Sequence, residues 1–178
     1  MDERFKHAAA IVASLVLTAG ILFYNPVERL EPQLGEYGYA GVFLVMLVSS
    51  ATVILPVPGL LSAFAMGHAY NFALVGIAGG IGSALGELSG YLLGFGGAGL
   101  VEDRRIAAYE ETKKWMRSNG FLTIFVLSAL PNPVFDLAGI AAGSLGYPWW
   151  KFLAACALGK ILKVTAFAYA GLRVFGFF

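Results

Sequence analysis

Apolar residues dominate this chain in a series of runs that short polar or charged segments separate. The runs cover residues 8–24, 39–55, 59–70, 72–97, 121–130, 134–145 and 149–172. A helix that spans a bilayer needs roughly 20 consecutive apolar residues, whereas three of these runs have only 10 to 12, and the 17-residue run at 39–55 ends at Pro56. The pattern therefore predicts three transmembrane helices, at 8–24, 72–97 and 149–172, and four shorter apolar arms.

The four short arms form two pairs, and proline interrupts each pair near its middle. The first pair meets at Pro56, Pro58 and Gly59, and the second meets at Pro131 and Pro133. Half-helices that stop inside a bilayer are stable only where protein or a water-filled cavity covers them. We therefore expect two re-entrant hairpins, each of which enters and leaves the membrane on the same side.

A hairpin followed by a long helix occurs twice along the chain. An offset of 75 residues superimposes the two proline pairs, and an offset of 73 superimposes Gly86-Glu87 on Gly159-Lys160. Counting the crossings gives the two units opposite orientations in the membrane. Inverted repeats with broken helices that meet near the midplane are a known transporter design.

The predicted fold is thus an all-α integral membrane protein, an inverted repeat of a re-entrant helical hairpin plus a transmembrane helix, with an extra N-terminal transmembrane helix. Residues 1–178 form a single membrane domain in this interpretation. Its parts are the N-terminal helix and outer loop (1–38), repeat one (39–98), a cytoplasmic connector helix (99–120) and repeat two (121–178).

Basic residues set the expected orientation of these helices. Segment 101–119 holds five of the twelve lysines and arginines, whereas segment 25–38 holds one. By the positive-inside rule, segment 101–119 and the N-terminus face the cytoplasm. No small-residue cleavage site follows the first apolar run, so we interpret it as an uncleaved helix.

Composition supports the membrane assignment and narrows the function classes. Hydrophobic residues make up 58% of the chain, charged residues only 13%, and the mean hydropathy is +0.75, whereas a soluble domain has about 25% charged residues. The lone Cys156 excludes a disulfide within one chain. The small size favours a prokaryotic plasma membrane, and an endomembrane is the alternative.

Four ionisable side chains lie deep in apolar sequence: Glu87, Asp136, Lys160 and Lys163. Each unpaired charge at the bilayer centre costs roughly 2.5–3.5 kcal/mol on insertion scales. Two acids and two bases can escape this cost by pairing, and the two lysines share a helix face. We expect the acids to meet the lysines at the centre of the bundle, either as a polar site or as a purely structural salt bridge.

Two further features accompany these charges. Gly82, Gly86, Gly90 and Gly94 recur every four residues, a spacing that lets another helix approach closely, and packing is the main interpretation of the row. Asn132 lies between two prolines, where its amide can satisfy freed carbonyl groups or contact a lipid headgroup.

Other kinds of site have no support in the sequence. No histidines and cysteines occur at metal-ligand spacing, and no phosphate-binding loop or set of nucleophile and base is visible. We therefore expect no enzyme activity, no metal and no cofactor. Membrane phospholipids are the expected partners and nucleic acid is not, while a homo-oligomer is left open.

Three motifs carry a resemblance to a known family. The string PNPVFDLAGIAAG at 131–143, GELSGY at 86–91 and GKILK at 159–163 resemble motifs of the VTT-domain family, which includes the DedA proteins, and most closely its vacuole membrane protein branch. DedA members carry arginines near the second hairpin's proline, where this chain has Ala129, Val134 and Phe135.

The resemblance implies two facing re-entrant hairpins and movement of lipid between leaflets. The absence of the DedA arginines favours an energy-independent phospholipid scramblase with a polar groove between the hairpins. A proton- or ion-coupled transporter or flippase of a small solute or of a polyprenyl-phosphate lipid is the alternative, and a non-transporting scaffold is a third hypothesis.

Overall fold

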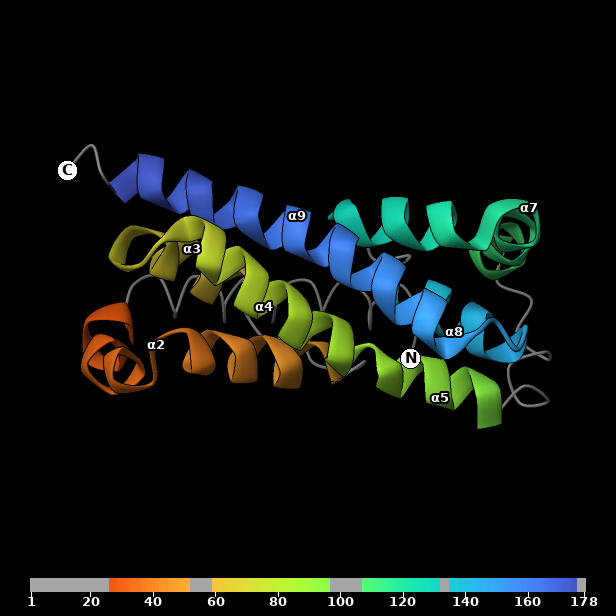
Figure 1. The fold of residues 1–178 in the computed structure, drawn as a ribbon, viewed down its shortest axis with the longest axis horizontal. Helices are drawn as coiled ribbons and strands as arrows, with labels where there is room; N and C mark the ends of the chain where they lie inside the picture. The colour runs from red at the N-terminus through yellow and green to blue at the C-terminus, as the bar shows by residue number, and fades with distance from the viewer. Residues whose placement is uncertain (1–25, 52–58, 97–106, 132–134, 176–178) are drawn as a thin grey trace, which may run out of the picture. The chain divides into compact units, whose positions relative to one another are not determined.

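The structure is a computed structural model that describes residues 26–51, 59–96, 107–131 and 135–175. Every regular element in these ranges is an α-helix, which confirms the all-α prediction (Figure 1). The predicted helix at 8–24 lies outside the described residues. The helices are α2 (Pro26–Ala51), α3 (Gly59–Ala69), α4 (Phe72–Gly86), α5 (Leu88–Gly96), α7 (Ala107–Ala129), α8 (Phe135–Ser144) and α9 (Trp149–Phe175).

The chain divides into two compact units, Met1–Gly38 and Tyr39–Phe178. The division falls inside α2 at Gly38, whose φ of 47° is accessible to glycine because it lacks a Cβ atom. Residues 25–38 were expected to form a polar loop, but the chain is helical from Pro26. Proline suits the first turn of a helix, where its missing N–H has no partner to lose.

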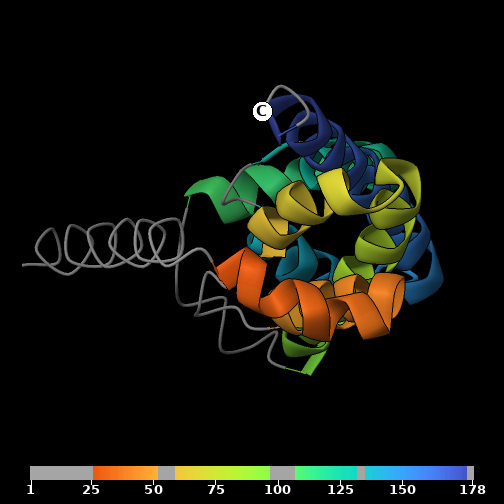
Figure 2. The same cartoon turned by 90° about the vertical axis from the view of Figure 1, so that its left-hand side faces the viewer.

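The second unit is built around two long apolar stretches, Phe72–Gly96 and Trp149–Phe175, which are long and apolar enough to cross a membrane. The first was expected as one long helix; α4 and α5 are assigned separately on either side of Glu87, but helical i→i−4 hydrogen bonds continue through this residue. Helix α9 lies along α4, with α3 near one end of α9 and α8 near the other (Figures 1 and 2).

The short arms pack against the two long stretches. Helix α3 packs on α9, although it belongs to the first hairpin, and α8 of the second hairpin packs on α5. The C-terminal half of α7 packs on α9, and the C-terminal half of α2 contacts α4 at Gly82 and Gly86. Each long stretch therefore contacts arms from both predicted hairpins.

Local signals in the sequence define several helix ends. The side chain of Asn71 accepts hydrogen bonds from the N–H groups of Ala73 and Leu74, which caps the start of α4. Asn119 has non-helical dihedrals inside α7, so the predicted connector helix ends there. Gly146, with a φ of 62°, ends α8 in a Schellman motif.

Small side chains fill much of the core in the described part of the second unit. Ala84, Ala138, Ala141, Ala142 and Ala155 are among its buried members. Many large apolar side chains point outward instead, with Leu92 and Phe95 more than 60% exposed. This inversion is typical of helices that pack through small residues and present large ones to lipid.

Candidate functional site

A buried ion pair joins the two long apolar stretches near their middle. Lys160 Nζ of α9 donates a hydrogen bond of 2.6 Å to Glu87 Oε1, and each side chain is 7% exposed. Glu87 lies between the last residue of α4, Gly86, and the first residue of α5, Leu88. The predicted pairing of Glu87 with one of the two lysines is therefore present.

The aromatic and cationic ends of α9 indicate how deep this pair lies. Lys151 contacts the ring of Trp150 near one end, and Arg173 donates to the Tyr169 hydroxyl and contacts its ring near the other. Such residues are typical of membrane interfaces. Lys160 is nine residues from both Lys151 and Tyr169, or about 14 Å at the helical rise. These two ends are therefore about 27 Å apart, close to the roughly 30 Å of a hydrocarbon layer, and the pair lies midway between them.

Helical i→i−4 hydrogen bonds continue through Glu87, between α4 and α5. Its N–H bonds to the Ser83 carbonyl at 3.2 Å, and its own carbonyl accepts from the Tyr91 N–H at the same distance. The Ser89 hydroxyl lies 2.9 Å from the Gly86 carbonyl and 3.1 Å from the Ala51 carbonyl. Serine hydroxyls commonly bond to carbonyl groups of the preceding helical turn, and here the same hydroxyl also reaches the end of α2.

Two serines on the short arms, Ser50 and Ser128, lie beside the charged positions, and the sequence analysis did not identify them. Ser50 of α2 and Ser83 of α4 share a hydrogen bond of 2.5 Å one turn before Glu87. Ser128 of α7 is fully buried against Gly159, the residue before Lys160. Both arm serines lie in apolar sequence without a charged neighbour, so only their packing against the long helices identifies them.

Lys163 extends the polar stripe of α9. It is 8% exposed and lies about one turn after Lys160 on the same buried face, while Cys156 lies one turn before Lys160 and is fully buried. Asp136 belongs to the first turn of α8, but its side chain lies outside the described part of the structure, as do Asn132, Pro133, Pro56 and Pro58. Gly59 begins α3, and Pro131 follows α7.

Close backbone contacts at the glycine row hold the pair in register. A Cβ atom at Gly82 or Gly86 would collide with a carbonyl oxygen of α2, and one at Gly94 would collide with the Ile140 carbonyl of α8. Gly90 is buried, and its backbone lies near Gly139 of α8. The row therefore packs against both arms, and this close approach is possible because these positions lack a side chain.

Chemically, the arrangement places one carboxylate and two ammonium groups among small apolar residues, midway between the aromatic and cationic ends of α9. In the described residues no group of three or more potential metal ligands occurs. Such a site offers charges of both signs to a dipolar group. The buried hydroxyls beside it add hydrogen-bonding capacity.

Comparisons with known proteins agree with a membrane setting. The family model described as the VTT domain matches residues 57–173. Vacuole membrane protein KMS1 of Arabidopsis thaliana is 33% identical over 108 residues, which cover 48% of this chain and 26% of that protein. Vacuole membrane protein 1 of Homo sapiens is 31% identical over 105 residues, which cover 47% of this chain and 26% of that protein.

A third relative matches a shorter segment. The vacuole membrane protein 1 homolog of Dictyostelium discoideum is 49% identical over 41 residues, which cover 23% of this chain and 10% of that protein. The matched segments thus span about a quarter or less of the relatives' length. No solved structure matches the chain.

Proposed function

The chain belongs to the VTT-domain family, and from this premise we propose that it is a phospholipid scramblase, which lets lipid headgroups cross the bilayer in both directions without an energy source. The observation that carries the proposal is the buried Glu87–Lys160 pair between two apolar stretches. Its relatives are named as membrane proteins, which supports the same setting for this chain.

The physical barrier to lipid exchange is the desolvation of the headgroup. A polar group that enters hydrocarbon without partners loses several kcal/mol of solvation, roughly 2–7 for a single amide or hydroxyl. A site with both signs of charge can compensate the phosphate and the amine of a zwitterionic headgroup together. Glu87 would meet the amine, and Lys160 with Lys163 would meet the phosphate, while the acyl chains stay in lipid.

Recurring contacts support the finer proposal of an inverted repeat. Gly94 of α5 approaches the Ile140 carbonyl of α8, and Gly171 of α9 approaches the Phe64 carbonyl of α3 in the same way. Gly86 likewise meets the turn of α2 that carries Ser50, and Gly159 meets the turn of α7 that carries Ser128. In each case a glycine of a long stretch meets a short arm, and the same contact recurs in the other half.

The two halves differ by one helical turn beside the ion pair. Gly143 of α8 approaches the Tyr91 carbonyl, and Gly67 of α3 approaches the Ala168 carbonyl, so Tyr91 and Ala168 correspond. Tyr91 follows Gly86 by five positions, whereas Ala168 follows Gly159 by nine. The additional four residues are about one turn. In this proposal the addition lies between Gly159 and Ala168, the stretch that also carries Lys160 and Lys163.

The decisive experiment is lipid exchange by purified protein in liposomes with labelled phospholipids. Wild-type protein should remove the protection of inner-leaflet label, with or without a pH gradient. Glu87→Gln should slow the exchange, because the site then loses its negative charge. The matched control is Glu110→Gln on α7, whose side chain is 61% exposed and pairs with Lys113 at 3.8 Å.

Two outcomes would overturn the proposal. No exchange by folded wild-type protein would remove the scramblase activity, and equal rates for wild type and a folded Glu87→Gln variant would remove the ion pair from it. Uptake of a solute or lipid that requires a pH gradient would favour the coupled-transport alternative. A prokaryotic plasma membrane and a cytoplasmic N-terminus stay predictions of the sequence.

A further inference from the structure

The partner of the buried carboxylate in this structure is a primary ammonium group. Lys160 Nζ lies 2.6 Å from Glu87 Oε1, and each side chain is only 7% exposed. A short, charge-assisted hydrogen bond of this kind requires an N–H group on the cation. The ammonium of an ethanolamine headgroup has the same N–H groups as a lysine side chain. The carboxylate is therefore already placed to accept from this class of cation.

A zwitterionic headgroup can enter this pair without leaving a charge uncompensated. Its ammonium would take the place of Lys160 beside Glu87, and its phosphate would accept from the released Lys160 ammonium. A ligand with one sign of charge would instead leave one partner buried and unpaired, which is costly. The pair therefore favours a ligand that carries a phosphate and an ammonium together.

Close contacts on both sides of Lys160 restrict the size of that ammonium. A Cβ atom at Gly80 of α4 would lie 2.5 Å from the Cα atom of Ile161, the residue after Lys160. A Cβ atom at Gly159, the residue before it, would collide with the Ser128 hydroxyl. Neither glycine has room for an added methyl group, so the turn that carries Lys160 is held tightly against α4 and α7.

A choline headgroup lacks the N–H and is larger. Its nitrogen carries three methyl groups, whose carbon atoms stay about 3.3–3.6 Å from a carboxylate oxygen, so the nitrogen itself stays about 4 Å or more away. Proteins typically recognise such a quaternary ammonium with a cage of aromatic faces. A carboxylate that bonds an ammonium at 2.6 Å therefore suits choline poorly.

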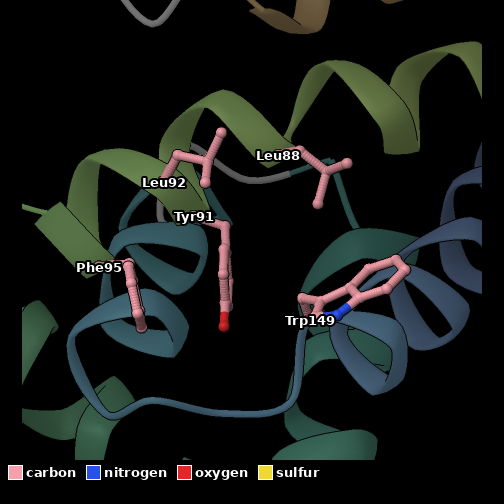
Figure 3. A pocket seen from close by; sticks show the side chains of 5 residues that line it. All are labelled: Leu88, Tyr91, Leu92, Phe95 and Trp149. Atoms are coloured by element: carbon pink, nitrogen blue, oxygen red, sulfur yellow. The ribbon is translucent and has the colours of Figure 1, made fainter.

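The aromatic side chain nearest to the pair along its own helices is engaged in other packing. Among the positions one helical turn from Glu87 or Lys160, Tyr91 alone is aromatic. Its hydroxyl donates to the Tyr147 carbonyl at 2.6 Å, and its ring contacts Phe152 with centroids 5.3 Å apart. Figure 3 shows it in the lining of an apolar pocket of about 310 Å³, and none of the lining residues is acidic: Leu88, Tyr91, Leu92, Phe95 and Trp149.

We propose that the Glu87–Lys160 pair selects phospholipids whose headgroup ammonium carries an N–H, such as phosphatidylethanolamine, over phosphatidylcholine. The inference rests on the proposed function in one respect, because it takes the pair as the place that a headgroup enters. Loss of a hydrogen bond to a charged group lowers affinity about tenfold or more. A buried site that hydrogen-bonds its ligand discriminates in this way against an analogue without the donor.

Four lipids with identical acyl chains provide the test: phosphatidylethanolamine, its N-methyl and N,N-dimethyl derivatives, and phosphatidylcholine. Each differs from the next by the mass of one methylene group, so native mass spectrometry of the full-length protein in detergent compares them in one competition. Phosphatidylethanolamine should bind about tenfold or more better than phosphatidylcholine. The largest step should come at the last methylation, which removes the last N–H. Equal binding of the dimethyl lipid and phosphatidylcholine, or no binding of any of the four, would overturn the inference.

Variants of the pair locate the preference. Glu87→Gln should remove it, and Glu110→Gln, whose carboxylate is 61% exposed, should retain it. Because Glu87→Gln leaves Lys160 without its carboxylate, the double variant Glu87→Leu/Lys160→Leu is a second test that leaves neither partner unpaired. It should bind the ethanolamine and choline lipids equally. A folded double variant with the wild-type preference would overturn the inference, because the preference would then come from another site.

Exchange of the same lipids in liposomes separates this inference from the proposed function. A binding preference for phosphatidylethanolamine in a protein that exchanges no lipid would retain the headgroup site and reject the scramblase. Equal binding together with equal exchange of the ethanolamine and choline lipids would reject the selectivity and retain the scramblase.

Discussion

Removing one partner of the buried ion pair should destabilise the fold much more than removing both. Glu87→Gln leaves Lys160 with a positive charge among buried neighbours and without its carboxylate at 2.6 Å. Breaking a buried pair in this way costs about 3–5 kcal/mol, whereas replacing both partners with apolar residues is often neutral or stabilising. The double variant Glu87→Leu/Lys160→Leu should therefore be at least as stable as the wild type.

Stability and lipid exchange should respond differently in these variants. We expect the double variant to keep the fold and lose exchange, because it removes the charges that compensate the headgroup. Denaturant unfolding in detergent gives the stability, and vesicle assays give the exchange rate. Glu110→Gln is the control, since its carboxylate is 61% exposed and its 3.8 Å pair with Lys113 contributes less than about 1 kcal/mol.

Two results would refute this reasoning. A Glu87→Gln variant that unfolds at the same denaturant concentration as the wild type would mean that the pair does not stabilise the fold. A stable double variant that exchanges lipids at the wild-type rate would mean that the pair is only a structural salt bridge. The second result would favour the scaffold hypothesis for these residues.

Two further predictions concern packing around the site. Gly86→Ala should destabilise the fold by about 1–3 kcal/mol, because the new Cβ would collide with the Leu47 carbonyl, whereas Gly96→Ala, with nothing within 4 Å, should not; equal unfolding midpoints for the two would contradict this. Tyr91→Phe should cost about 1 kcal/mol through the lost bond to the Tyr147 carbonyl, and an unchanged unfolding curve would show that this bond contributes nothing.

Much of the architecture could be predicted from local sequence patterns, without knowledge of the tertiary contacts. Long apolar runs predict the two stretches that can cross a membrane, and Asn71, Asn119 and Gly146 mark helix ends through their own side chains or backbone freedom. The glycine row likewise predicts close helix packing. The helical start at Pro26 was missed because polar residues suit a surface helix as well as a loop.

The sequence by itself determined that this protein is helical, that it belongs in a membrane, and which few charges need partners there. Only the tertiary structure decided that Glu87 meets Lys160, and that Ser50 and Ser128 pack beside the charged turns. Periodicity identifies the buried face of one helix. Glu87 and Lys160 are 73 residues apart in the chain. The register between their helices depends on close backbone contacts across the bundle, which occur at glycines.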